Sequence, residues 1–199
     1  MSLVGTAQHF RFRNDNGSET GATWMAPEDT EAILSLTTGE NKNFRLRWCF
    51  DGAVPPEGDD TEIIFSVSHN GGPPVGIGST TSPLQGVVST WITQGEYTTN
   101  QLTVPPGDTY QSIQGCTSNV IAQSPGLLFE TGIAIECEVA FVAIADALAA
   151  NDTLDFTWAG FIFGAGEWGQ YSGNVRLQIA FGSPFPLLTN SRIPNIGFR

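Results

Sequence analysis

Residues that could perform acid–base or nucleophilic chemistry are few in this chain. Its two histidines, His9 and His69, are the side chains that could act as a general base near neutral pH without a pKa shift. His9 alternates with apolar residues and His69 lies in a His-Asn-Gly-Gly turn, so we expect both at the surface. No Gly-x-Ser-x-Gly motif, phosphate-binding loop or paired-histidine spacing occurs. The sequence therefore predicts no catalytic residues, no metal, no cofactor and no enzymatic activity.

Two further groups of residues, the cysteines and an acidic loop, could form a disulfide bond or a calcium site. The cysteines Cys49, Cys116 and Cys137 are odd in number and widely spaced, which is typical of free or buried thiols. A single bridge from Cys137 to either of the others is the alternative. The acidic loop at 51–60 could gather oxygens around calcium, but its spacing matches no known calcium loop. We therefore expect a solvated acidic turn there.

The distribution of charge excludes two classes of partner. No lysine or arginine occurs from residue 48 to residue 175, and the net charge of the chain is -12. Binding to nucleic acid or to an anionic membrane requires a basic surface that displaces counterions. No apolar run reaches the roughly 18 residues of a membrane span, and the first residues predict no signal peptide. The sequence therefore predicts neither nucleic acid nor membrane as a partner.

The elements that would position these residues are β-strands, because the dominant hydrophobic period is two. Apolar side chains alternate with polar ones around residues 9–13, 44–50, 62–68, 133–141 and 174–181. Gly and Pro are frequent (23 and 12), which is typical of short strands joined by tight turns. These patterns predict an all-β, antiparallel β-sandwich, jelly-roll-like, with a single domain over 1–182.

Two local signals predict connections between these strands. The Asn14-Asp-Asn-Gly17 sequence predicts a hairpin turn, with a return strand that carries Ala22 and Trp24. A proline followed by acids before Thr30–Leu34 predicts one short helix there.

Four arginines stand on the outer faces of two of the expected strands: Arg11, Arg13, Arg45 and Arg47. If these strands pair, the like charges crowd together, which is unfavourable unless acids lie opposite. Glu136 and Glu138, on the polar face of another strand, are one candidate set of partners. A neighbouring subunit is a second, and solvation among acids of the same chain is a third. The four arginines are accordingly interface candidates.

The last 17 residues, 183–199, combine prolines with apolar side chains. Prolines exclude a regular helix or central strand, yet a solvated tail would not be this hydrophobic. We expect an extended arm that lies in a groove of its own domain or of a neighbouring subunit. Its interface candidates are Phe185, Leu187, Leu188, Ile193, Ile196 and Phe198.

One pair of aromatic residues could bind a carbohydrate. Trp168 and Tyr171 lie in a Gly-rich loop, where exposed rings could stack on a sugar. Packing in a core or an interface is the other interpretation of both side chains.

The segment Phe10-Arg-Phe-Arg-Asn-Asp-Asn-Gly-Ser-Glu-Thr-Gly-Ala-Thr-Trp24 resembles the opening of a group of phage- and prophage-encoded virion proteins. Members begin with an Arg-x-Arg-Asn-Asp-x-Gly-Ser-Glu-Thr hairpin that ends in Ala-Thr-Trp. The order of later segments is also similar, and the resemblance covers about residues 8–157. Phe44-Arg-Leu-Arg47 and the strand from Ile63 into Asn-Gly-Gly72 carry part of it.

The resemblance implies a small, β-rich structural or accessory protein of a tailed-phage virion, and it supplies no catalytic residues. The function we expect is decoration or stabilisation of the capsid. A tail or head-fibre component and a carbohydrate-binding or host-attachment module are the alternatives. The expected partners are further copies of the chain, for example in a trimer, and other virion proteins such as the major capsid protein. The protein would be made in the host cytoplasm and located in the virion.

Overall fold

The computed structural model describes residues 6–51, 61–78, 83–118, 132–162, 166–170 and 175–182. Within these ranges the chain forms strands and one short 3₁₀ helix, so the expectation of an all-β fold is confirmed. The elements are β1 (Thr6–Asn14), β2 (Ala32–Leu36), β3 (Lys42–Asp51), β4 (Thr61–His69), β5 (Val75–Gly76), β6 (Leu84–Gly86), β7 (Thr109–Tyr110), β8 (Cys116–Thr117), β9 (Ile133–Ala143), η1 (Ala145–Ala147), β10 (Thr153–Ile162), β11 (Gly166–Gln170) and β12 (Val175–Phe181).

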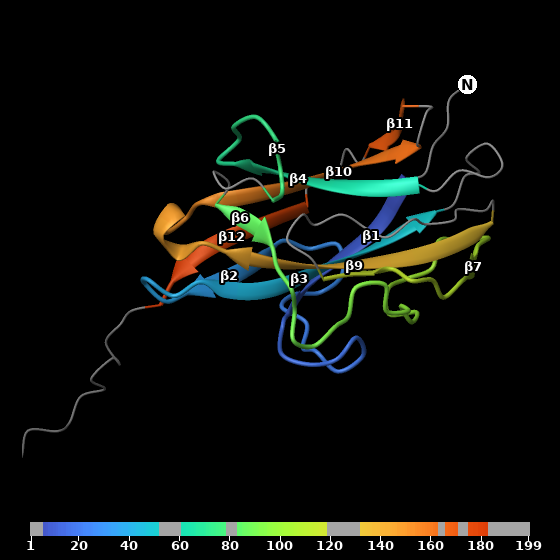
Figure 1. Cartoon of the computed structure of the whole chain (residues 1–199), viewed down its shortest axis with the longest axis horizontal. Helices are drawn as coiled ribbons and strands as arrows, with labels where there is room; N and C mark the ends of the chain where they lie inside the picture. Colours follow the sequence, from blue (N-terminus) through green and yellow to red (C-terminus); the bar gives the residue numbers. More distant parts are fainter. Residues whose placement is uncertain are drawn as a thin grey trace, which may run out of the picture.

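The strands form two sheets that lie face to face as a β-sandwich-like pair of layers (Figure 1). Sheet A has the order β1-β3-β9-β6, with β7 and β8 also paired to β9. Sheet B has the order β2-β12-β10-β4-β5, with β11 paired to β10. Most pairs are antiparallel as expected, but β2 runs parallel to β12, and β7 and β8 run parallel to β9.

The core between the sheets is rich in aromatic side chains. The alternation of the long strands places Phe12 and Phe50 of sheet A against Phe156 and Trp158 of sheet B. The ring centroids of Phe12 and Phe156 are 5.6 Å apart, and those of Phe50 and Trp158 are 5.0 Å apart. Edge-to-face contacts at these distances add to the free energy of apolar burial. One main cluster of buried side chains includes residues of both sheets.

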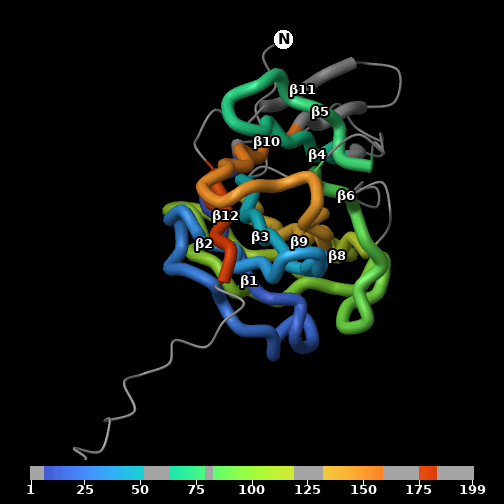
Figure 2. The backbone as a smooth tube through the Cα atoms, turned by 90° about the vertical axis from the view of Figure 1, so that its left-hand side faces the viewer, coloured from blue at the N-terminus to red at the C-terminus, as the bar shows by residue number. Residues whose placement is uncertain are grey.

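The other face of sheet A is covered by two segments of the same chain. We call residues 15–24 the opening loop and residues 87–118 the covering segment. Figure 1 and Figure 2 show the opening loop and the following turn in blue on one side of the molecule, with the covering segment in green beside it. The covering segment packs so closely that a Cβ atom on Gly115 would lie 2.2 Å from the carbonyl oxygen of Glu136. Sheet A is therefore covered on both faces.

Two local expectations are wrong in an informative way. The turn after Asn14 does not return as a paired strand, because β1 pairs with β3 and the expected return strand is reduced to a bridge between Arg13 and Trp24. The helix expected at Thr30–Leu34 does not form. Ala32–Leu36 is strand β2 instead, and every second side chain of this strand is buried in the core. Among the described residues, no helix is long and apolar enough to cross a membrane.

Candidate functional site

The site richest in charged groups is a buried cluster on the covered face of sheet A. Strands β1, β3 and β9 lie side by side in the register that pairs Arg13 with Arg45 and Arg47 with Glu138. Because alternate residues of a strand point to one face, three arginines and two glutamates converge there. The five residues are Arg13, Arg45, Arg47, Glu136 and Glu138, and all are fully buried.

Glu138 is the common acceptor of the cluster. Its carboxylate accepts hydrogen bonds from Nη1 of Arg13 at 2.9 Å, Nη1 of Arg45 at 2.6 Å and Nη1 of Arg47 at 2.5 Å. Charge-assisted bonds of this kind are about twice as strong as neutral ones. One carboxylate therefore joins three arginines that would otherwise repel each other.

Glu136 connects the cluster to the covering segment. One carboxylate oxygen pairs with Nε of Arg47, and the other accepts the backbone N–H groups of Gln101 and Leu102, both at 2.9 Å. Arg47 in turn donates to the carbonyl oxygen of Thr99 at 2.5 Å. Buried charges need such additional partners, because ion pairing alone rarely offsets the loss of hydration. The covering segment supplies them.

The opening loop supplies the remaining partners. Arg45 donates to the carbonyl oxygen of Gly17 at 2.6 Å, and its Nε lies 3.2 Å from the carboxylate of Asp15. Nη2 of Arg47 lies 2.7 Å from the carboxylate of Glu19, which also accepts the backbone N–H of Thr99. The loop is thus held to the sheet and to the covering segment by the same charged groups.

The electrostatics of the cluster keep its cations charged. Burial lowers the pKa of Arg47, but the carboxylates of Glu138, Glu136 and Glu19 outweigh burial and raise the pKa above its ordinary value. Burial lowers the pKa of Arg13, which Glu138 offsets only in part. Arginine remains protonated in either case, because its ordinary pKa is already above about 12. In the cluster, the charged arginines are therefore paired with the carboxylates of Glu138, Glu136 and Glu19.

The structure corrects the interface expectation for Arg13, Arg45 and Arg47. They are fully buried and paired within the chain, so a partner cannot reach them. Of the partners considered, Glu136 and Glu138 are the ones that the structure places opposite. Arg11 is half-buried, donates to the carbonyl oxygen of Ala26 at 2.8 Å and lies over the ring of Trp24.

Other predicted site residues lie outside the described part of the chain. This holds for Tyr171 and for the arm 183–199 with its apolar candidates from Phe185 to Phe198, and nothing is described of the side chain of Trp168. The exposed apolar side chains that the structure describes are elsewhere: Ile33, Val75, Val88, Trp91 and Tyr97. The last three belong to the covering segment, where no periodic pattern of the sequence predicts which side chains face the solvent.

The thiols and the second histidine are engaged in the fold. Cys49, Cys116 and Cys137 are free and buried, and burial raises the pKa of Cys49 and of Cys137 to about 12. The alternation of β3 places Cys49 on the same face as Arg45 and Arg47, opposite to the face of Cys137, and predicts an exposed thiol if that face met water. This expectation is wrong, because the face is covered and Cys49 is buried. His69 lies 2.8 Å from the carboxylate of Asp152 within a turn.

Comparison with known proteins adds no relative to this description. No model of a protein family matches the chain, and no curated protein is similar to it in sequence.

Proposed function

We propose that this protein is a non-enzymatic structural or accessory component of a tailed-phage virion, and that it decorates or stabilises the capsid. One observation carries the proposal. Three of the four charged residues of the opening motif, which carries the resemblance to virion proteins, are engaged in the buried cluster: Arg13, Asp15 and Glu19. A motif whose charges fasten a loop to a sheet marks a rigid scaffold and leaves no catalytic group.

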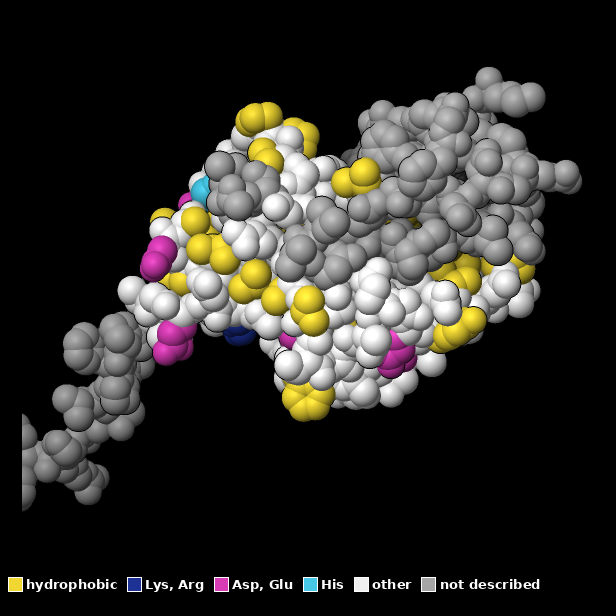
Figure 3. Space-filling view, viewed as in Figure 1, with side chains coloured by type: hydrophobic (Ala, Val, Ile, Leu, Met, Phe, Trp, Pro, Cys, Tyr) yellow, Lys and Arg dark blue, Asp and Glu magenta, His cyan; other side chains and the backbone are white. Residues whose placement is uncertain are grey.

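The surface supports docking to protein. Among the described residues, the face in Figure 3 shows acidic and apolar side chains and very little lysine or arginine. In the covering segment, Val88, Trp91 and Tyr97 are 65%, 50% and 60% exposed. Tryptophan and tyrosine are enriched where proteins bind each other, because they bury a large area at a small cost in conformational entropy. We infer that the covering segment contacts the neighbouring virion protein.

The mechanism is linkage between binding and assembly. A protein that binds the assembled lattice and not its free subunits stabilises the assembled state. The proposed partners are the major capsid protein and further copies of this chain, in a trimer or other small ring. The arm 183–199 is a second proposed contact. The jelly-roll connectivity remains a prediction, and the parallel pair β2–β12 departs from a purely antiparallel scheme.

The test is binding to particles of the phage whose genome encodes the chain, prepared without this protein. The wild type should co-sediment with the particles at saturable stoichiometry. The Trp91→Ala/Tyr97→Ala variant should bind at least tenfold more weakly, while Ile33→Ala/Val75→Ala, which changes two exposed apolar residues of sheet B, should bind normally. Equal affinities of the two variants would contradict docking through the covering segment.

Removal of residues 183–199 separates two roles of the arm. If the arm contacts a partner, the truncated chain should keep its cooperative unfolding transition and lose particle binding or self-association. Loss of the transition itself would place the arm within the fold of its own domain. Saturation at a few copies per particle would favour the alternative, a tail or head-fibre component.

A further inference from the structure

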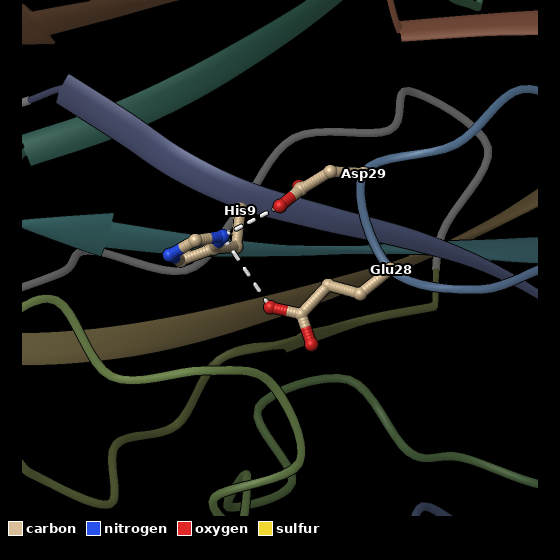
Figure 4. A group of neighbouring side chains, drawn as sticks. All are labelled: His9, Glu28 and Asp29. Atoms are coloured by element: carbon tan, nitrogen blue, oxygen red, sulfur yellow. Dashed lines mark hydrogen bonds and ion pairs between the residues drawn. The ribbon is translucent and has the colours of Figure 1, made fainter.

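Three potential metal ligands converge beside β1, away from the buried cluster. Figure 4 shows the imidazole of His9 facing the carboxylates of Glu28 and Asp29. Strand alternation places His9 on the same covered face of sheet A as Arg11 and Arg13, where its partner on β3 is Cys49. The segment that carries the two acids runs along β1, where the backbone N–H of Asp29 donates to the carbonyl oxygen of Phe10 at 2.9 Å.

The ligand atoms lie at distances that a metal ion could bridge. Nδ1 of His9 is 2.7 Å from Oδ2 of Asp29 and 3.4 Å from Oε1 of Glu28. For metal–ligand bonds of about 2.1 Å, the edge of a tetrahedron is roughly 3.4 Å. The longer of the two separations already fits that edge, and the shorter one must open by less than about 1 Å.

Groups outside the triad hold both carboxylates in place. Oδ1 of Asp29 accepts the backbone N–H of Phe10 at 2.9 Å, which leaves Oδ2 turned toward the imidazole. Oε1 of Glu28 accepts the backbone N–H of Thr103 from the covering segment at 2.9 Å. The three side chains are 22–44% exposed, so water can complete a coordination shell.

The charge balance at this end of sheet A favours a cation. Among the described residues, the ion pairs of Glu28 and Asp29 are both with His9, and no arginine or lysine pairs with either. Asp51 lies on the same face of β3 as Cys49, the partner of His9, and adds a further carboxylate to this end of sheet A. Burial and the neighbouring Asp108 raise the pKa of its carboxyl group.

We propose that His9, Glu28 and Asp29 bind a divalent cation of the zinc class, through one imidazole nitrogen and two carboxylate oxygens with water in the remaining positions. One nitrogen and two oxygens suit Zn²⁺ and its neighbours better than Ca²⁺ or Mg²⁺, which prefer oxygen alone. The ion fastens the 25–29 segment to β1 and, through the bond from Thr103 to Glu28, stabilises the docking of the covering segment. The proposal is independent of a role in the virion.

The test is calorimetric titration of tag-free, chelator-treated wild type with Zn²⁺, together with thermal unfolding with and without the ion. The wild type should bind one equivalent, and its Tm should rise by roughly 5–10 °C at a free zinc concentration near 100 times Kd. His9→Gln should weaken binding at least 100-fold and abolish the Tm rise. His69→Gln, which changes the other histidine of the chain, should bind within twofold of wild type.

Glu28→Gln is a second variant, which keeps the test decisive if His9→Gln does not fold. It should also bind at least tenfold more weakly while its far-ultraviolet circular dichroism is unchanged. Wild-type affinity in a folded His9→Gln or Glu28→Gln variant would overturn the proposal, as would the absence of any zinc binding by the wild type. Substitution with Co²⁺ should give visible d–d bands without a thiolate charge-transfer band, and such a band would assign a ligand to Cys49 instead.

Discussion

Replacement of Glu138 by glutamine tests the buried cluster with little change in shape. Glu138→Gln removes the charge that three arginines share, while the side-chain volume is almost the same. The amide oxygen can still accept hydrogen bonds, but its NH₂ group would face guanidinium donors. Arg45 would then depend on the carboxylate of Asp15, and Arg47 on those of Glu19 and Glu136. Arg13 would keep the backbone carbonyl oxygens of Glu19 and Ala22 as acceptors.

The expected loss of stability is large for a single atom change. Removal of one partner of a buried ion pair costs about 3–5 kcal/mol. Because the amide retains part of the hydrogen bonding, we expect about 3 kcal/mol here. At about 2–4 °C per kcal/mol for a protein of this size, Tm should fall by roughly 6–12 °C. At about 2 kcal/mol per molar urea, the unfolding midpoint should fall by roughly 1.5 M.

Urea unfolding followed by tryptophan fluorescence measures this loss, because Trp48 and Trp158 are buried in the core between the two sheets. Glu40→Gln is the matched control, since Glu40 is exposed in a turn and the same chemical change there should alter stability by less than about 0.5 kcal/mol. If the two variants unfold at the same urea concentration, the cluster does not hold the fold as described.

Three further predictions concern titratable groups. Cys49→Ser should cost about as much as Cys137→Ser, roughly 1–3 kcal/mol each, because both thiols are buried; a silent Cys49→Ser in urea unfolding would mean that its face is exposed. Burial raises the pKa of Asp152, but hydrogen bonds from Asn70, Ala149 and His69 outweigh burial, so its pKa is lowered in the folded state. Asp152 therefore stabilises the fold above its unfolded pKa of about 4, and this contribution is lost as the pH falls from there through the lowered pKa of the folded state. In the Asp152→Asn variant, the urea midpoint should consequently depend less on pH in this acid range. Burial and then Asp108 raise the pKa of Asp51, so its ionised carboxylate destabilises the folded state at pH 7. Asp51→Asn should therefore raise the urea midpoint at pH 7, and a lower midpoint would refute the crowding of the two acids.

The strands could be predicted from the sequence because their period is local. The alternation around Phe44–Phe50 and Ile133–Phe141 predicts β3 and β9 and their two faces. It thereby places Arg45 and Arg47 on the same face as Glu138, with Arg47 directly opposite it. Whether the polar face of sheet A contacts water or is covered by other segments could not be predicted. Alternation of apolar and charged residues is typical of a sheet with one face in water, whereas here the charges pair with each other under a cover.

The cover itself was not predictable because its contacts are between distant residues and use backbone groups. Gln101 and Leu102 contribute N–H groups, which carry no side-chain signal. The Asn14–Gly17 sequence predicts a hairpin that does not form, and glycine is required at position 17 for another reason. A Cβ atom would lie 2.8 Å from the backbone of Gly21, so the opening loop closes on itself instead of returning as a strand.

The proposed metal ligands were missed for the same reason. His9 is separated from Glu28 and Asp29 by about twenty residues, with no spacing that marks a motif, and the set forms only because the 25–29 segment runs along β1. The positive φ of 57° at Asp29, uncommon for a residue other than glycine, helps to present its carboxylate to β1.

The measurement that tests the proposed role in a virion most directly is the copy number of this chain in purified particles. It is obtained by quantitative mass spectrometry against the major capsid protein, in gradient-purified particles of a phage whose genome encodes the chain. A capsid decoration protein should be present at a fixed ratio to the capsid lattice, in tens to hundreds of copies. Absence of the chain from purified particles, with abundant protein in the infected cell, would contradict a structural role in the virion.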